Sequence, residues 1–162
     1  ALIRCGLKRL PELMDRRDEC GFYLQSLLQG IPGLGYARMH DGATRHAWHL
    51  FIGKYDAAQF GGVPRERFLA AVSAEGIPIG RGYNPLYQEP LFRNGIRADE
   101  CPLACKFYTG AMDYTQVSCP VTERVCEEEG WWIFQSALLG EKSDMDDVAA
   151  AITKVRDNLD EL

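Results

Sequence analysis

One stretch decides the fold of this chain. Residues 61–92 read GGVPRERFLAAVSAEGIPIGRGYNPLYQEPLF. Two glycines interrupt the preceding element, and Pro64 stands near a first helical position, where a helix tolerates proline. The residues that follow have an apolar helical face, formed by Phe68, Leu69 and Val72. Gly76 closes this helix, and residues 77–80, IPIG, predict a short strand. We therefore expect a helix that leads directly into a sheet.

On the N-terminal side, residues 2–29 predict one long amphipathic helix, because leucines recur at three- and four-residue steps. Pro11 interrupts the pattern and predicts a kink or a break near residue 10. IPGLG at 31–35 predicts a turn, and HAWHLFIGKY at 46–55 is aromatic and β-branched enough for a strand.

On the C-terminal side, residues 93–119 have no clear period, and we expect them to be irregular. Residues 120–129 predict a short helix with its glutamates exposed, and residues 131–135, WWIFQ, predict a buried strand. Ser143 is a suitable N-cap for a last helix, whose early aspartates suit its positive first turn. The expected fold class is α+β, with a small antiparallel sheet covered on one face by helices.

Composition limits the classes of function. The 162 residues suggest one domain, and 46% hydrophobic with 25% charged residues is ordinary for a globular protein. The net charge of -5 and the scattered arginines exclude an electrostatic nucleic-acid surface. No apolar run is long enough to span a bilayer or to form a signal core, so we expect no membrane partner and a cytoplasmic location.

The metal and thiol candidates are weak. Cys101 and Cys105 are four positions apart, Cys119 and Cys126 are seven apart, and no histidine lies near them, which argues against zinc. We expect buried free thiols, with a disulfide between Cys101 and Cys119 as the alternative. His46 and His49 on a strand would point to opposite faces, which is poor geometry for a shared metal.

The loop at 80–92 is the exception in a chain without a complete catalytic set. No HExxH, GxSxG or P-loop motif occurs, and the five lysines lie in polar or helix-surface contexts. The loop combines two prolines, two glycines and several planar or hydroxyl groups: Arg81, Tyr83, Asn84 and Tyr87. This mixture is expected for a wall that contacts a polyhydroxylated or carboxylated small molecule. The alternative is a packed connection whose aromatic rings fill a groove of its own domain.

Several segments occur in a familiar order. They are LKRLPE at 7–12 with the arginine pair at 16–17, IPGL at 31–34, WHLF at 48–51, PRERF at 64–68 with EGIP at 75–78, YNPLY at 83–87, CPVTER at 119–124, LLG at 138–140 and the end of the last helix at 158–162. Together they resemble the DegT/StrS family of sugar aminotransferases, and are most similar to its members that act on scyllo-inosose and related aminocyclitol ketones.

The resemblance implies an architecture. Residues 1–162 correspond to the C-terminal small domain of fold type I pyridoxal-phosphate aminotransferases, with a long helix at 2–29 and an α/β layer at 36–162. The large cofactor domain is not matched, and the lysine, stacking aromatic residue and aspartate that hold the cofactor belong to it. We therefore expect pyridoxal phosphate in the full-length enzyme, and neither cofactor binding nor activity by this chain alone.

The resemblance also implies a role. The full enzyme would move an amino group from glutamine or glutamate to a sugar or cyclitol ketone, and would work as a homodimer. In this chain, substrate contacts are implied for Tyr83, Asn84 and Tyr87, and Arg81 is implied for the donor carboxylate. Arg45 and His49 are weaker candidates. The alternative is a stand-alone ligand-binding or interaction module derived from such a domain, without catalysis. Exposed apolar surface on the first helix and on the loop would favour the small-domain interpretation.

Overall fold

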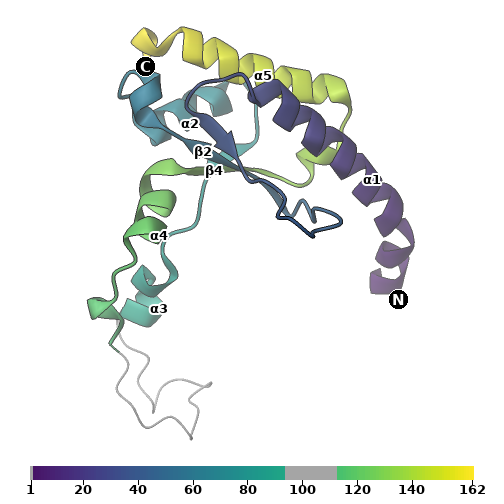
Figure 1. Cartoon of the computed structure of the whole chain (residues 1–162), viewed down its shortest axis with the longest axis horizontal. Helices are drawn as coiled ribbons and strands as arrows, with labels where there is room; N and C mark the ends of the chain where they lie inside the picture. Colours follow the sequence, from purple (N-terminus) through teal and green to yellow (C-terminus); the bar gives the residue numbers. More distant parts are fainter. Residues whose placement is uncertain (1, 94–112) are drawn as a thin grey trace, which may run out of the picture.

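The computed structural model describes residues 2–93 and 113–162. It contains a four-stranded antiparallel sheet with its long helices on one face, which confirms the α+β class (Figure 1). The main elements are α1 Leu2–Leu28, β1 Leu34–Tyr36, β2 Leu50–Tyr55, α2 Arg65–Ala74, β3 Ile79–Arg81, α3 Pro90–Arg93, α4 Pro120–Arg124, β4 Gly130–Phe134 and α5 Lys142–Asp157. Among the described residues, no helix has the length and apolarity that a membrane span requires.

The sheet has the strand order β1-β2-β4-β3. Ile52 of β2 lies opposite Trp132 of β4, and Ile79 of β3 lies opposite Ile133. Because β2 and β3 are both antiparallel to β4, they run in the same direction and end at the same end of the sheet. The connection that follows β3 therefore leaves from the end at which β4 begins.

The core lies between one face of the sheet and three helices. Alternate residues of β2 point into it, and α1, α2 and α5 contribute buried side chains that include Leu24, Phe68 and Val148. Gly53 leaves space for a neighbouring ring in this core, because a Cβ at that position would lie 2.0 Å from Trp131 Cε2. The glycine thus lets the indole ring of the neighbouring strand lie flat across β2.

Helix α1 is continuous through Pro11, so the predicted break is wrong and the alternative of a kink remains. The helix changes direction towards its N-terminal end (Figure 1). Proline removes one backbone hydrogen bond and crowds the preceding turn, which bends a helix without ending it when packing holds the remainder. Cys20, Leu24 and Leu28 supply that packing in the C-terminal half.

The predicted strand at 46–55 begins only at Leu50. Trp48 has φ 49°, a left-handed conformation that no regular strand contains. Its indole Nε1 donates to Asp18 Oδ1 at 2.7 Å, and a Cβ at Gly21 would lie 2.8 Å from the ring. The contact with α1 therefore overrides the strand propensity of this segment. The expectation that His46 and His49 alternate along a strand is wrong for the same reason.

Two further boundaries differ from expectation. Helix α5 begins at Lys142 and is capped by Glu141 instead of Ser143, because Glu141 and Asp144 form a reciprocal capping box. The helix predicted at 120–129 is α4 only as far as Arg124, after which residues 125–129 form one π-helical turn. The strand predicted at 131–135 is β4, one residue earlier, and its last residue, Phe134, is exposed.

The described cysteines are all free thiols, as expected, but they are not all buried. Cys20 is buried, Cys126 is half-buried, and Cys5 and Cys119 are exposed. The alternative disulfide involves Cys101, which lies outside the described residues, as does Cys105.

Candidate functional site

The predicted loop leaves the sheet beside the start of β4. Arg81, the last residue of β3, lies opposite Trp131. A Cβ at Gly82 would lie 3.9 Å from the carbonyl oxygen of Gly130, so the chain turns away close to the neighbouring backbone. The loop is thereby anchored to the edge of the sheet.

Tyr83 folds back over the uncovered face of the sheet. Its ring meets Trp132 edge-on, with centroids 4.4 Å apart and planes at 66°, and Trp132 is followed by Phe134 at 6.4 Å. The Tyr83 side chain nevertheless remains 68% exposed. The three rings form an open aromatic surface, and this geometry is suited to packing against a partly apolar surface.

Hydrogen bonds within the loop hold the rest of it together. Asn84 Nδ2 donates to Glu89 Oε1 at 2.9 Å, and the backbone N–H of Gln88 donates to the carbonyl oxygen of Pro85, a buried residue. Arg81 is exposed and forms no ion pair with any described residue, so its guanidinium is available to an anion. The loop therefore combines the two predicted interpretations, with a packed base and an exposed polar and aromatic rim.

Tyr87 is tied to the other side of the loop's base. Its hydroxyl donates to Glu123 Oε1, and the backbone N–H of Cys119 donates to the Tyr87 hydroxyl at 3.2 Å and to Glu123 Oε1 at 3.0 Å. The hydrogen bond between the two side chains raises the pKa of Tyr87 and lowers the pKa of Glu123. Glu123, which the sequence placed on an exposed helix face, is a partner of this site.

Arg45 and His49 lie elsewhere. Arg45 Nη2 forms ion pairs with Asp15 at 2.6 Å and Asp18 at 2.8 Å, both on α1. His49 precedes β2, at the end of the sheet where β4 finishes, whereas the loop leaves from the opposite end. The structure brings together Arg81, Tyr83, Asn84 and Tyr87 in one segment and separates Arg45 and His49 from it.

Arg65 is a residue that the sequence did not single out. Its side chain is 2% exposed, and its Nη1 donates to the carbonyl oxygens of Cys126 at 2.9 Å and Gly130 at 2.8 Å. Nη2 pairs with Glu66 at 2.6 Å. The guanidinium thus holds the π-helical turn against the start of β4, beside the loop. An arginine at the start of a helix ordinarily faces solvent, so no pattern marked it.

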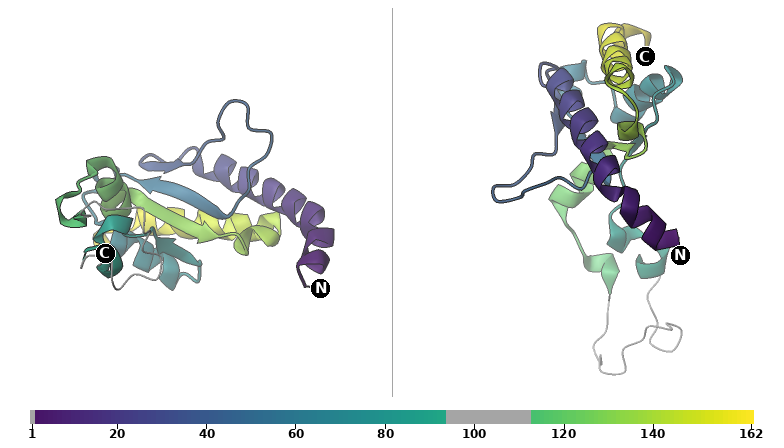
Figure 2. Two further views of the ribbon diagram at one scale, coloured as in Figure 1. Left: turned by 90° about the horizontal axis from the view of Figure 1, so that it is seen from below. Right: turned by 90° about the vertical axis from the view of Figure 1, so that its right-hand side faces the viewer.

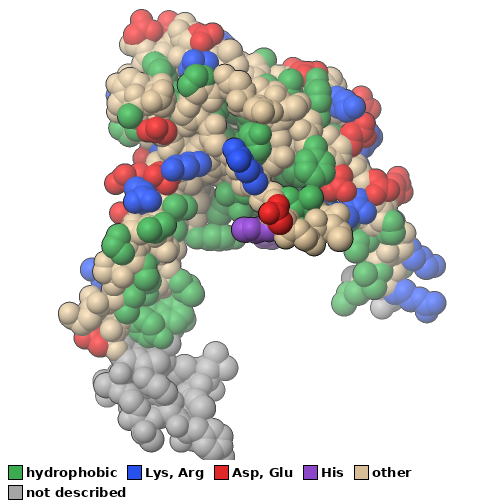
Figure 3. Space-filling model, in the orientation of Figure 1, with side chains coloured by type: hydrophobic (Ala, Val, Ile, Leu, Met, Phe, Trp, Pro, Cys, Tyr) green, Lys and Arg blue, Asp and Glu red, His purple; other side chains and the backbone are tan. Residues whose placement is uncertain are grey.

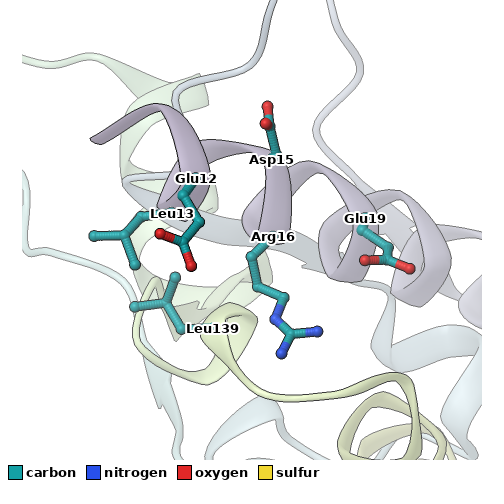
Figure 4. Close-up of a pocket in the computed structure, with 6 residues that line it drawn as sticks. All are labelled: Glu12, Leu13, Asp15, Arg16, Glu19 and Leu139. Carbon is teal, nitrogen blue, oxygen red and sulfur yellow. The ribbon is translucent and has the colours of Figure 1, made fainter. Parts of the chain in front are cut away.

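The hollows of the described surface include two that bear on the site. One of about 240 Å³ adjoins the loop and is lined by Tyr87, Gln88, Arg93, Tyr114, Thr115 and Val117. The other is an open groove of about 410 Å³ between α1 and Leu139 (Figure 4). Glu12 and Arg16 point towards Leu139 there, whereas Asp15 points away. Its mixed charges form no catalytic set.

The described lysines do not fit a pyridoxal-phosphate site. Lys142 pairs with Glu19 at 3.2 Å and Lys154 with Glu75 at 2.7 Å, and both side chains are more than half exposed. Lys54 is equally exposed, and Lys8 lies on the exposed part of α1. A lysine that forms a Schiff base is usually desolvated, which none of these is. The fifth lysine, Lys106, lies outside the described residues.

A family model supplies the identity that the geometry alone leaves open. The model of the DegT/DnrJ/EryC1/StrS aminotransferase family matches residues 1–130. The chain belongs to this family. The match includes α1, the strands β1, β2 and β3, and the loop at residues 80–92. It confirms the resemblance that the sequence segments indicated.

Relatives in the DegT/DnrJ/EryC1/StrS family are similar over most of this chain. A protein of Micromonospora echinospora, proposed to be an L-glutamine:3-amino-2,3-dideoxy-scyllo-inosose aminotransferase, is 33% identical over 161 residues, which cover 98% of this chain and 38% of the relative. The L-glutamine:2-deoxy-scyllo-inosose aminotransferase of the same organism is 31% identical over 156 residues, 93% of this chain and 36% of the relative. The chain thus spans little more than a third of their length, and it matches their C-terminal part.

Solved structures of the family share the fold. 3-Amino-5-hydroxybenzoic acid synthase superimposes with a TM-score of 0.69 at 20% identity, covering 93% of this chain and 36% of that one. The aminotransferase TlmJ from Streptoalloteichus hindustanus gives a TM-score of 0.66 at 21% identity, covering 98% and 35%. Both confirm the arrangement of sheet and helices.

Proposed function

We propose that this chain is the C-terminal domain of a pyridoxal-phosphate-dependent aminotransferase that transfers an amino group from glutamine or glutamate to a sugar or cyclitol ketone. In this proposal the chain supplies specificity contacts. The part of the full-length enzyme that lies outside this chain supplies the cofactor chemistry, and the full-length enzyme is a homodimer. Pyridoxal phosphate, when bound there, provides the electron sink for amino transfer.

The observation that carries the proposal is the loop in its family context. The family match includes the loop, and the relatives named above act, or are proposed to act, on scyllo-inosose derivatives with L-glutamine. The loop presents the exposed Tyr83 ring beside Trp132, with Arg81 and Asn84 at its rim. Ring faces suit the apolar face of a cyclitol, and planar polar groups suit its hydroxyls or a donor carboxylate.

The predicted residues differ in how well the geometry supports them. Tyr83 and Arg81 have no hydrogen bond or ion pair within the described residues, so their polar groups are available to a ligand. The side-chain amide nitrogen of Asn84 donates a hydrogen bond to Glu89, whereas its side-chain carbonyl oxygen accepts none from the described residues. Tyr87 is engaged with Glu123, and Arg45 with two aspartates, so we assign them supporting contacts at most, and His49 likewise.

The test uses the full-length enzyme with its cofactor. Tyr83→Ala should raise KM for the ketone acceptor about fivefold, because a stacking contact of this kind contributes on the order of 1 kcal/mol. It should leave the half-reaction with the amino donor unchanged. The matched control is Phe22→Leu, an exposed aromatic residue of α1. Unchanged acceptor kinetics in the Tyr83 variant would remove this residue from the site.

A second measurement tests the division of labour. This chain mixed with pyridoxal phosphate should show no stable internal-aldimine absorbance, since its described lysines are solvated. The complete polypeptide should show that absorbance and should aminate a cyclitol ketone with glutamine. A complete polypeptide that binds the cofactor but aminates no sugar or cyclitol ketone would contradict the proposed substrate class.

A further inference from the structure

The connection between β1 and β2 stands apart from the body of the domain. Residues 37–47 form this β1–β2 connection, and every one of them except His46 is exposed. Both panels of Figure 2 show the connection standing out from the sheet. Near its tip, the backbone N–H of Ala43 donates to the carbonyl oxygen of His40. A segment with so little buried surface depends on a few contacts for its position.

Part of this anchoring consists of solvated side-chain contacts with α1. At the start of the connection, Gln25 Nε2 donates to the carbonyl oxygen of Ala37 at 3.0 Å. At its end, Arg45 Nη2 lies 2.6 Å from Asp15 Oδ1 and 2.8 Å from Asp18 Oδ2. The Arg45 side chain is 41% exposed, and solvent screening leaves such ion pairs weak. These contacts alone hold the connection only loosely.

A further anchor joins His46 to the buried Trp48. The backbone N–H of Trp48 donates to His46 Nδ1 at 2.9 Å, and the two rings lie with their centroids 4.2 Å apart and their planes at 31°. An Asn or Asp side chain that accepts from the N–H two residues later makes the same kind of contact in an Asx turn. His46 is half-buried and Trp48 is 1% exposed, so this contact ties the connection to the core.

The indole of Trp48 and its backbone are held by different groups. The indole Nε1 donates to Asp18 at 2.7 Å, and the ring meets Phe22 edge-on with centroids 5.1 Å apart. The backbone has φ 49°, a conformation that a bulky residue keeps only when its surroundings impose it. The hydrogen bond to His46 fixes the backbone at this point. Loss of that acceptor would therefore release the chain before Trp48 while the indole stays in place.

The His46 contact requires one charge state of the imidazole. Nδ1 accepts a hydrogen bond only when it carries no proton, so the ring is neutral and its hydrogen is on Nε2. An imidazolium has an N–H on both nitrogens, and it would direct one donor at another at the Trp48 N–H. Histidine changes its charge between about pH 5 and pH 8. Protonation of His46 thus removes the contact within the physiological range of pH.

The charged groups around His46 belong to its own segment and to α1. Arg45 precedes it, and Asp15 and Asp18 lie on the facing helix. Because Arg45 pairs with both carboxylates, neither is free to hold an imidazolium in place of the lost contact. Figure 3 shows histidine, in purple, at the lower margin of the visible face, next to apolar and acidic side chains.

We propose that His46 is a pH-sensitive latch for the β1–β2 connection. With a neutral imidazole, His46 accepts from the Trp48 N–H and holds the end of the connection against α1. With a protonated imidazole, the Trp48 N–H has lost this acceptor, and the connection is left with its solvated contacts through Gln25 and Arg45. The latch is closed at higher pH and opens as pH falls through the titration of His46. The inference goes beyond the proposed function, because the latch needs neither substrate nor cofactor.

The experiment is amide hydrogen exchange of the full-length enzyme, read by mass spectrometry at about pH 8 and about pH 5. Each rate is divided by that of an unstructured peptide of the same sequence at the same pH. Protection of residues 38–48 should fall at least about fivefold from the higher to the lower pH. His46→Asn offers an acceptor that gains no proton, so protection should persist at both pH values. His46→Phe keeps a ring against Trp48 without an acceptor, so protection should be low at both.

His40→Asn is the matched control, because His40 is an exposed histidine of the same connection, and this variant should keep the pH dependence of the wild type. Equal protection of the wild type at both pH values would overturn the inference. A pH dependence that persists in His46→Asn, or that disappears in His40→Asn, would do so as well. Exchange in α5 reports on the domain as a whole and should change little. A rise there in step with the connection would show global opening and would contradict a local latch.

Discussion

The hydroxyl of Tyr87 donates a hydrogen bond to the carboxylate of Glu123, 36 positions further along the chain. The backbone N–H of Cys119 contacts both groups, so these polar groups meet at the base of the loop. This contact joins the loop that carries Tyr83 and Asn84 to the start of α4. It gives Tyr87 a defined role in positioning the loop, whether or not a substrate also reaches it.

Tyr87→Phe should loosen the base of the loop. The variant keeps the ring but removes the hydroxyl group, and it leaves Glu123 with the Cys119 N–H and the Ser118 side chain as its partners. We expect amide exchange at residues 82–88 and 118–123 to accelerate severalfold, with little change in the helical core. Tyr83→Phe is the matched control, since the Tyr83 hydroxyl forms no hydrogen bond with the described residues. Equal exchange in the two variants would show that the contact does not hold the loop.

The same contact should depend on pH at both ends of the scale. Its hydrogen bond lowers the pKa of Glu123 below the usual value of about 4.3, so its stabilisation is present above that pH and is lost as pH falls through the folded-state pKa. The bond raises the pKa of Tyr87 above about 10, so stabilisation is present below that pH and is lost as pH rises further. Amide exchange at the base of the loop should be slowest between these two pH limits, and Tyr87→Phe should flatten the pH profile.

Arg65→Met should destabilise the domain by about 2–4 kcal/mol. It keeps much of the volume but leaves the buried carbonyl oxygens of Cys126 and Gly130 without their donor. Chemical denaturation measures the loss. Glu66→Gln is the control, because its exposed side chain pairs with the same guanidinium and a surface ion pair contributes only about 0–1 kcal/mol. Similar losses in both variants would contradict the role assigned to the two carbonyl contacts.

Gly53→Ala should cost about 1–3 kcal/mol or more. The new methyl group would overlap the indole of Trp131, which is packed on its other side by the core. Gly35→Ala, in the neighbouring strand β1, offers a comparison, because a Cβ there would lie 3.4 Å from Lys54 Cβ, which is an ordinary van der Waals distance. Thermal unfolding of the pair should separate the two substitutions clearly. A small loss of stability in the Gly53→Ala variant would mean that the Trp131 indole can shift.

Tyr55 should ionise at a higher pH than an exposed tyrosine does. Burial raises its pKa to about 12, and its hydroxyl donates to the carbonyl oxygen of Val63 at 2.8 Å. Because the folded-state pKa is raised, the associated stability is present below about pH 10 and is lost as pH rises towards 12. Absorbance at about 295 nm should therefore show one tyrosinate appearing only near pH 12, at or just before unfolding, and Tyr55→Phe should abolish that step. A normal ionisation near pH 10 would mean that the ring is solvated.

Much of the fold follows from local patterns. Leu24 and Leu28 mark the buried stripe of α1, and Phe68 and Val72 mark that of α2, since apolar spacing at three and four residues is decided by neighbours along the chain. The glycines and prolines of residues 80–92 likewise predict a rigid loop. Where a distant element intervenes, the pattern fails. Trp48 leaves the strand to reach Asp18, and Glu141 replaces Ser143 as a cap because Asp144 completes a reciprocal pair.

The candidate site likewise has residues that the sequence identified and residues that only the fold brings to it. The sequence identified Arg81, Tyr83, Asn84 and Tyr87 as candidates because they lie close together in one unusual segment, residues 80–92. It could not identify Glu123 or Arg65 as their supports, since each acts across a separation of at least 36 residues. Nor could it reveal Trp132 as the ring beneath Tyr83, because the register of β3 against β4 sets that contact.

By itself, the sequence determined the fold class and the family, and it marked residues 80–92 as the candidate recognition segment. Short-range spacing and the order of motifs suffice for these. The tertiary structure alone decided which groups are engaged and which are available, and which apolar faces remain uncovered. Those properties depend on contacts between elements far apart in the chain, whose burial and hydrogen bonding no local pattern encodes.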